Sequence, residues 1–355
     1  MNQIKSATTA EVSTDDLDCG DFTRLPAAPL VSIHMITYQH AAFIKEALDS
    51  VLMQKVQFPY EICLGEDGST DGTREICLEY ARKYPDKIRL FLRNRANPAR
   101  SYFKAPYMFN AASTFNACRG KYIAFLEGDD YWTHPHKLQL QVDQLEFDPT
   151  QAASCHFAVS MDDGTPWVAG ITPTYPIESF ELGGILRREV GNIHTSTWLL
   201  RRGKPMEWES FRTCLFGEYP IIIWTLLQGS ARVLPRILSL YRIHEGGAFS
   251  PLSYEIRLRE NVELWRSLES IIPPDIRSSV VIGLSRTLTL YTAVLRKAGK
   301  FRLALAAFKS NLSTIARVRT SSAQRRQLQL LAFESLVAPR LPGLRARLRE
   351  WRSQS

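Results

Sequence analysis

The sequence predicts an α/β protein with a largely parallel sheet, followed by a helical C-terminal region. Two patterns predict this fold class. Over the first half of the 355-residue chain, apolar strand-like segments alternate with amphipathic helical segments, which is typical of parallel strands joined by helices. Beyond residue 250, apolar residues recur with the helical period of about 3.6 residues almost throughout. Because 45% of the residues are hydrophobic and 23% are charged, the chain can bury a substantial core.

The first half of the chain has a regular order of elements. Residues 1–29 are polar, rich in Thr and Asp, and end in LPAAPL, so we expect a flexible tail there. After it, we predict strands at 31–37, 60–66, 87–92 and 122–127, and helices at 41–54, 71–84 and 107–118.

The alternation weakens beyond residue 150. We predict strands at 153–161, 194–202 and 237–244, and helices at 217–229, 254–271, 277–299 and 300–318. The expected division is a tail at 1–29, a catalytic α/β domain at 30–250 and a helical region with a basic tail at 251–355.

Composition limits the class of protein. The six cysteines are scattered, without a C-x-x-C pair or metal-finger spacing, which is typical of free thiols in a reducing cytoplasm. The N-terminus lacks the features of a signal peptide. No uninterrupted run of about 18 apolar residues occurs, so we expect no membrane-spanning helix.

The net charge of +8 is concentrated near the C-terminus, where nine arginines and two glutamates lie between Arg317 and Arg352. A basic helical tail can contact an anionic membrane surface, at about 1 kcal/mol per basic residue. A solvated basic face explains the same residues equally well. Nucleic acid is not the expected partner, although the tail leaves that question open.

Acidic residues follow two of the predicted strands. Glu66 and Asp67 come at the end of one strand, and Glu127 and Asp129 at the end of another. The carboxyl ends of parallel strands border one crevice, where carboxylates suit Mg²⁺ or Mn²⁺ bound together with a diphosphate. The alternative is a turn that caps the next helix, which explains most of the segment EDGSTDGT.

Several motifs together resemble the family 2 glycosyltransferases, which have the GT-A nucleotide-sugar-binding fold. They are VSIHMITYQHAAFIKEALDSVLMQ, EDGSTDGT, RGKYIAFLEGDDYW, HKLQLQVDQLE and LSLYRIHEGG, within residues 30–250. The resemblance implies that Thr37 and Tyr38 flank the nucleobase, and that Asp67, next to Glu66, hydrogen-bonds it. Glu66 stands where the family usually has Asp.

The same resemblance implies a metal site. Glu127-Gly128-Asp129 corresponds to the D-x-D-type motif, with Asp129 as the ligand of Mn²⁺ or Mg²⁺ and Glu127 toward the ribose. His244 is an acceptable further ligand for Mn²⁺, and Arg242 can pair with diphosphate oxygens. A strand-end histidine beside a Gly-Gly loop is the alternative interpretation of His244.

A carboxylate is also needed to deprotonate the acceptor. Glu218 stands where the resemblance implies the catalytic base, usually Asp, and such a base predicts inversion at the anomeric carbon. A first-turn helix acid is the alternative role. His194, Thr195 and Trp198 are candidates for the acceptor pocket, although a tryptophan on a strand is more often in the core.

The sequence therefore predicts a cytoplasmic, metal-dependent, inverting glycosyltransferase. Its expected donor is a nucleoside-diphosphate sugar, with uridine as the family's common base, and its expected acceptor is a glycan or a lipid-linked molecule in cell-surface polysaccharide or lipopolysaccharide synthesis. One alternative is a sugar nucleotidylyltransferase, which usually has a glycine-rich basic loop that is missing here. The other is a nucleotide-sugar-binding or scaffolding protein without catalysis.

Overall fold

A computed structural model describes most of the chain. The described residues are 17–19, 22–105, 107–162, 165–169, 178–187, 193–215, 218–247, 252–317 and 321–337. The chain divides into two compact units. The first unit comprises residues 1–179, 192–208 and 215–246, and the second comprises residues 180–191, 209–214 and 247–355.

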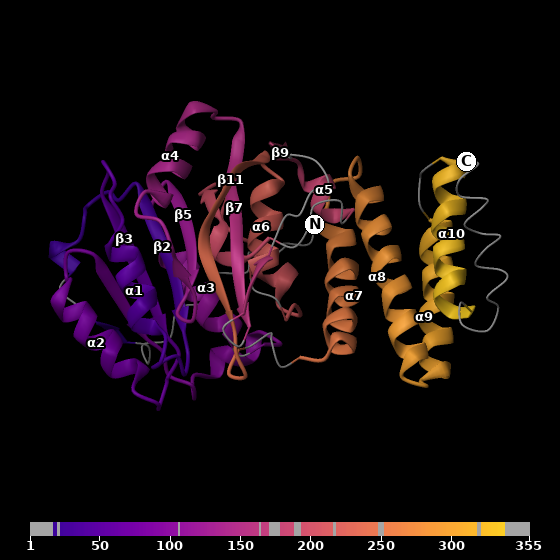
Figure 1. The fold of residues 1–355 in the computed structure, drawn as a ribbon, viewed down its shortest axis with the longest axis horizontal. Helices are drawn as coiled ribbons and strands as arrows, with labels where there is room; N and C mark the ends of the chain where they lie inside the picture. Colours follow the sequence, from indigo (N-terminus) through magenta and orange to yellow (C-terminus); the bar gives the residue numbers. More distant parts are fainter. Residues whose placement is uncertain are drawn as a thin grey trace, which may run out of the picture. The chain divides into compact units, whose positions relative to one another are not determined.

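The strands of the first unit form a mixed sheet (Figure 1). Along its main path the strand order is β1-β4-β3-β2-β5-β10-β7-β11-β6, and β8 pairs with β7. The strands are β1 (Leu17–Cys19), β2 (Val31–Thr37), β3 (Tyr60–Glu66), β4 (Ile88–Leu92), β5 (Tyr122–Glu127), β6 (Tyr131–Trp132), β7 (Gln151–Asp162), β8 (Thr165–Ala169), β10 (Leu199–Arg201) and β11 (Ser230–Ile243). A short strand, β9 (Ser179–Phe180), lies where the chain passes between the units.

Strands β4, β3, β2 and β5 are parallel to one another, as are β7 and β11, which confirms the predicted fold class. Every residue of β3 is buried, as expected for a parallel strand with both faces covered. The helices of this unit are α1 (Ile44–Leu52), α2 (Thr73–Lys83), α3 (Tyr107–Ala117), α4 (Lys137–Phe147) and α6 (Glu218–Leu226). Side chains of α1 and α2, such as Leu48 and Cys77, join Ile33 and Leu64 in one core.

The strand order reverses beside β2. The chain runs from β2 to β3 and β4, and then returns to β5 on the other side of β2. The loops that leave β2 and β5 therefore diverge in opposite directions, and this is where open α/β sheets bind ligands. The loop after β2 contains His40, and the loop after β5 contains Glu127-Gly128-Asp129.

Two segments differ from the predictions. The strand expected at 194–202 begins as a 3₁₀ turn, Thr195–Thr197, and only Leu199–Arg201 is extended. The Thr197 hydroxyl donates to the His194 carbonyl oxygen over 2.7 Å, which favours the turn over a ladder. Inside the segment expected to be a flexible tail, β1 pairs antiparallel with β4.

The second unit is helical. Its helices are α5 (Leu182–Leu186), α7 (Tyr254–Ile271), α8 (Arg277–Lys297), α9 (Phe301–Ala316) and α10 (Ser322–Val337). Val281 and Ile282 of α8 share a core with Ile315 of α9 and with Leu328 and Ala332 of α10. The helices of this unit therefore pack through the apolar faces that their 3.6-residue period predicted, as in a helical bundle.

Among the described residues, one helix, α8, is long and apolar enough to cross a membrane by length and composition alone. The sequence predicted no such helix, because serine, threonine and Arg286 interrupt its apolar residues. In the structure 61% of this stretch is buried, as is common for the core helix of a bundle.

Candidate functional site

The loop after β5 approaches the end of β2 very closely at Gly128. The Gly128 N–H donates to the Ile36 carbonyl oxygen over 2.9 Å. A Cβ atom at Gly128 would lie 2.4 Å from Thr37 Oγ1 and 3.0 Å from His40 Nδ1. Only glycine fits this approach without movement of the neighbours, so the close packing of the two loops requires Gly128.

Replacing Gly128 with alanine is expected to lower the free energy of unfolding by about 1–3 kcal/mol, because the added methyl group overpacks the contact with Thr37. Urea denaturation measures this change. The matched control is Gly203→Ala, whose added methyl group meets only the movable end of the Gln228 side chain. Equal stability of the two variants would contradict the close packing of these loops.

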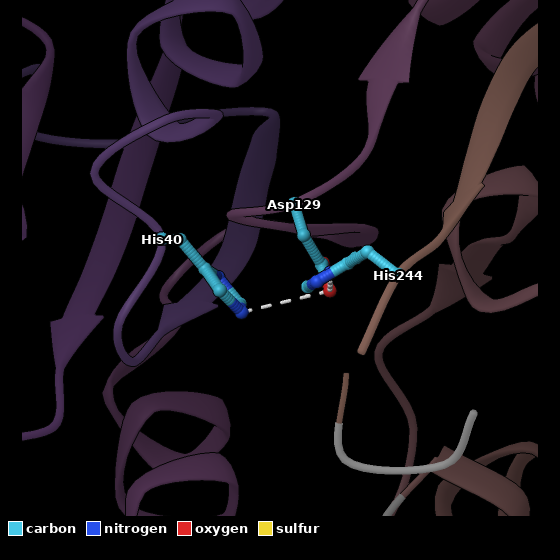
Figure 2. Close-up of side chains that lie close together, drawn as sticks. All are labelled: His40, Asp129 and His244. Atoms are coloured by element: carbon cyan, nitrogen blue, oxygen red, sulfur yellow. Dashed lines mark hydrogen bonds and ion pairs between the residues drawn. The ribbon is translucent and has the colours of Figure 1, made fainter. Parts of the chain in front are cut away.

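Three side chains from distant parts of the chain converge beside this loop (Figure 2). Asp129 Oδ2 lies 3.2 Å from His244 Nε2 and 3.5 Å from His40 Nε2. His40 Nδ1 lies 3.2 Å from Thr37 Oγ1, and the His244 ring packs on Phe43 with 4.7 Å between centroids. Each imidazole is thus held on its outer side and presents Nε2 to the same carboxylate.

The electrostatic setting favours an ionised Asp129. Burial alone raises the pKa of Asp129, but the hydrogen bond to His244 and the charges of His40 and His244 outweigh it and lower that pKa. Burial lowers the pKa of His40, against the opposing effect of Asp129. Burial, and then the charge of Asp129, raise the pKa of Asp130 well above its ordinary value.

Two groups of side chains have the donor atoms for a metal ion. One is His40, Asp129 and His244, and the other is Glu127, Asp129 and Asp130. Within each group the donor atoms lie within 4.8 Å of one another. Asp129 belongs to both groups. A carboxylate with imidazoles fits Mn²⁺ and other first-row transition metals, and a carboxylate group fits Mg²⁺ or Mn²⁺.

Arg242 supports the acidic loop from β11. Its backbone N–H donates to Asp130 Oδ1 over 3.0 Å, and its guanidinium donates to the Asp129 carbonyl oxygen over 2.6 Å. The guanidinium also pairs with Glu46 and lies over the ring of Tyr131, 4.6 Å from the centroid. With these partners, Arg242 positions Asp129 in this structure. The sequence predicted a different role, in which Arg242 extends toward a diphosphate.

Asp67 pairs with two arginines that the sequence patterns did not indicate as site residues. Arg95 donates to Asp67 Oδ2 over 3.0 Å, and Arg100 donates to both oxygens of the same carboxylate. Burial raises the pKa of Asp67, although Arg100 and Arg95 oppose that rise. The Arg95 guanidinium stacks on the exposed Tyr38 ring, 4.1 Å from its centroid. Tyr38 and Asp67 are thereby joined through Arg95.

Glu66 and Thr37 do not face a ligand surface. Glu66 is fully buried, and its two carboxylate oxygens accept from the Ser69 N–H over 2.6 Å and from Arg74 Nε over 2.5 Å. Its predicted part in nucleotide binding is therefore corrected, because it fixes the turn after β3. Thr37 is also buried, and its hydroxyl lies against His40, so it orients that imidazole.

The predicted catalytic base, Glu218, is the first residue of α6, and its side chain lies outside the described residues. One turn further along α6, Ile221 lines a small cavity together with Glu127 and Thr195. The first turn of α6 therefore lies near the end of β5. Thr195, predicted at the acceptor site, shares that cavity with Glu127.

The other two predicted acceptor residues differ in exposure, since Trp198 is buried and His194 is half-buried. Trp198 is 1% exposed, so no sugar ring can stack on it, and its predicted role is corrected. The rings of His194 and Tyr241 pack with 4.0 Å between centroids. Burial lowers the pKa of His194 to about 4, so its imidazole is neutral at neutral pH.

Sequence reasoning missed His40, Arg95 and Arg100. The available signal for His40 was its place three residues after the end of β2, on the crevice side of the sheet. The two arginines follow β4, the neighbour of β3, in the segment NRANPAR. Their pairing with Asp67 could have been considered, because this loop also leaves the carboxyl edge of the sheet.

A family model described as glycosyl transferase family 2 matches residues 32–205. The uncharacterized protein Rv1520 of Mycobacterium tuberculosis is 31% identical over 218 residues, which are 61% of this chain and 60% of that protein. The match thus spans less than two thirds of the length of that curated relative.

Two solved structures resemble the fold. S. aureus TarS 1–349 in complex with UDP-GlcNAc has a TM-score of 0.57 and 15% identity, over 86% of this chain and 88% of that chain. The mannosyltransferase PcManGT from Pyrobaculum calidifontis, in complex with GDP-Man and Mn²⁺, has a TM-score of 0.50 and 17% identity, over 90% and 88%. At these identities the likeness shows the fold alone.

The family match begins in β2 and includes the loops that carry His40 and Asp129, whereas His244 lies beyond its end. It agrees with the GT-A-like arrangement of the sheet and with the solved neighbours. The matched residues 32–205 belong to glycosyl transferase family 2, and their fold agrees with that family.

Proposed function

We propose that the chain transfers a sugar from a nucleoside-diphosphate sugar, with uridine as the expected base, to a hydroxyl of a glycan or lipid-linked acceptor. Residues 30–250 would form the catalytic domain, and residues 251–355 a helical region attached to it. One observation carries the proposal. Residues from the ends of β2, β5 and β11 converge on Asp129 at the point where the strand order reverses.

The nucleobase would bind beside Asp67 and Tyr38. A carboxylate has about four acceptor sites. Three N–H donors, one from Arg95 and two from Arg100, already point at Asp67, which is 2% exposed, so the base would replace the more exposed Arg95 to reach the carboxylate. The exposed Tyr38 ring, held by Arg95, offers an aromatic face next to that position.

The diphosphate would lie beside Asp129, with Glu127 and Gly128 on the ribose side as the family resemblance implies. Asp129 and His244 would hold the divalent cation, because their side chains meet beside the loop that follows β5. When bound, the cation would neutralise the negative charge that develops on the departing diphosphate. Arg242 would act indirectly, since its guanidinium and N–H hold the loop that carries Asp129.

Glu218 would accept the proton of the acceptor hydroxyl. Attack from the side opposite the diphosphate in a single displacement inverts the anomeric carbon. The position of α6 supports this role, because Ile221, in the next turn, borders the same cavity as Glu127. Thr195, on that cavity, and the nearby His194 remain the proposed contacts of the acceptor.

The direct test of the proposed function uses the purified chain with UDP-, GDP- and dTDP-sugars in the presence of Mn²⁺. We expect one donor class to raise the melting temperature and to be converted slowly to the free nucleoside diphosphate. EDTA should abolish both effects. Failure of every donor class to bind or turn over would reject the proposal.

We further propose that the enzyme works in the cytoplasm, in contact with the inner face of the membrane through its basic C-terminus, in synthesis of a cell-surface polysaccharide or lipopolysaccharide. Five arginines occur after residue 337: Arg340, Arg345, Arg347, Arg349 and Arg352. They lie outside the described residues. Basic residues near an anionic surface contribute about 1 kcal/mol each.

Deleting residues 338–355 is therefore expected to weaken binding to anionic phosphatidylserine vesicles at least about tenfold, and to leave donor hydrolysis unchanged. Vesicle sedimentation at two salt concentrations measures this. The deletion should not start at residue 317, because α10 would be lost and its Leu328 and Ala332 pack against Val281 and Ile282. Equal vesicle binding by both chains would contradict membrane contact through this tail.

A further inference from the structure

We propose that His40 joins Asp129 and His244 as a third protein ligand of the divalent cation, and that these three side chains favour a first-row transition metal such as Mn²⁺ over Mg²⁺. This inference rests on the proposed function, since it concerns the same cation. It adds a ligand, His40, that the sequence-based site lacked. It also assigns the class of metal that the site prefers.

The spacing of the donor atoms fits a common metal. Neighbouring ligands on an octahedral ion about 2.1 Å from each donor lie about 3.0 Å apart. Asp129 Oδ2 lies 3.2 Å from one Nε2 and 3.5 Å from the other, so only small movements are needed to bring all three donors to such an ion. A group of two histidines and one carboxylate is a known open-sided ligand set for transition metals.

The outer contacts of the two imidazoles resemble those of metal-ligating histidines. Such histidines usually have their second nitrogen or their ring fixed by neighbouring groups. Thr37 Oγ1 lies 3.2 Å from His40 Nδ1, and the ring of His244 packs against Phe43. The two imidazole rings are nearly perpendicular, at 80°, with 6.0 Å between centroids, so both can direct Nε2 toward one point.

The alternative ligand group is Glu127, Asp129 and Asp130. Asp130 is 1% exposed, and its Oδ1 already accepts the backbone N–H of Arg242. Asp130 is therefore built into the turn, whereas His40 and His244 both point at the Asp129 carboxylate (Figure 2). The imidazole group is the one that the geometry favours, and imidazole selects transition metals over Mg²⁺.

The experiment titrates the full chain with MnCl₂ in the absence of nucleotide and measures free Mn²⁺ by electron paramagnetic resonance. The wild type should bind one Mn²⁺ per chain, and about a hundredfold excess of Mg²⁺ should displace little of it. His40→Gln should raise the Kd roughly tenfold or more. The control His136→Gln, at an exposed histidine before α4, should bind as the wild type does.

A second measurement on the wild type covers the case in which His40→Gln fails to fold. Electron spin echo spectroscopy of the bound Mn²⁺ counts coupled imidazole nitrogens, and two are expected. One coupled imidazole, wild-type affinity in His40→Gln, or ready displacement by Mg²⁺ would overturn the inference. Each of these outcomes is compatible with metal-dependent donor turnover, so the inference and the proposed function can fail separately.

Discussion

Replacing Asp129 with asparagine is expected to lower donor turnover about 10³-fold, at nearly unchanged stability. Asp129 is the one carboxylate shared by both candidate ligand groups, and His40 and His244 both point at it. A bound divalent cation contributes several kcal/mol of charge stabilisation in the transition state, and each 1.36 kcal/mol changes a rate about tenfold. Steady-state release of the nucleoside diphosphate measures the effect.

The matched control is Asp130→Asn, one residue further along the same loop. Burial raises the pKa of Asp130 well above its ordinary value, whereas that of Asp129 is lowered, so Asp130 is the poorer candidate for an ionised metal ligand. An asparagine oxygen can still accept the N–H of Arg242, so turnover should stay within a few-fold of the wild type. Full activity in Asp129→Asn, or an equal loss in both variants, would contradict the special role of Asp129.

The second large effect is expected at Glu218. Glu218→Gln should lower kcat by about 10²- to 10⁴-fold, because general-base catalysis by a carboxylate contributes that much to a rate. The Kd for the donor should change little, since glutamine has nearly the same size and the base acts on the acceptor. Acceptor-dependent kinetics and calorimetric titration with the donor measure these two quantities.

Glu207→Gln serves as the control for Glu218→Gln, because Glu207 is exposed and lies eleven positions upstream in the same unit. It should leave both kcat and the donor Kd unchanged. If Glu218→Gln instead weakened donor binding and left kcat intact, Glu218 would be a donor contact or a helix-capping acid. The catalytic base would then have to be sought elsewhere.

The strands of the catalytic unit could be predicted from the sequence because their signal is local. The strands at 31–37 and 60–66 are confirmed to the residue, since each is a short apolar run bounded by polar turns. The strand expected at 237–244 begins earlier, at Ser230. Its first half alternates with exposed and charged residues such as Arg232 and Arg236, so its sequence does not look like a buried strand.

The partners of each site residue were harder to predict, because they come from distant parts of the chain. Asp129 and His244 are 115 positions apart, and Arg242 and Glu46 are 196 positions apart. No local sequence pattern predicts that the guanidinium of Arg242, which was expected to bind a diphosphate, pairs instead with Glu46 on α1. Only the pairing of β11 with β6 and β7 brings Arg242 and His244 to the acidic loop.

Residue type alone also could not predict which of the candidate site residues are buried. Trp198 and Glu66 looked like ligand contacts because an aromatic ring and a strand-end acid often serve that purpose. The structure buries both. Trp198 is 1% exposed, and Glu66 accepts from Ser69 in the turn after β3 and from Arg74 on α2. His40 is the opposite case: the sequence shows only that it follows β2, and its partner Asp129 becomes evident from the structure.

Calorimetric titration of the wild type and of Asp129→Asn with UDP, GDP and dTDP, each with and without Mn²⁺, tests the central claim most directly. The claim is that a nucleoside diphosphate and a metal bind together at the carboxyl ends of β2, β3 and β5. One nucleotide should bind the wild type with Mn²⁺ and lose most of its affinity without Mn²⁺ or in Asp129→Asn. Binding of no nucleotide, or binding that is indifferent to both changes, would contradict the claim.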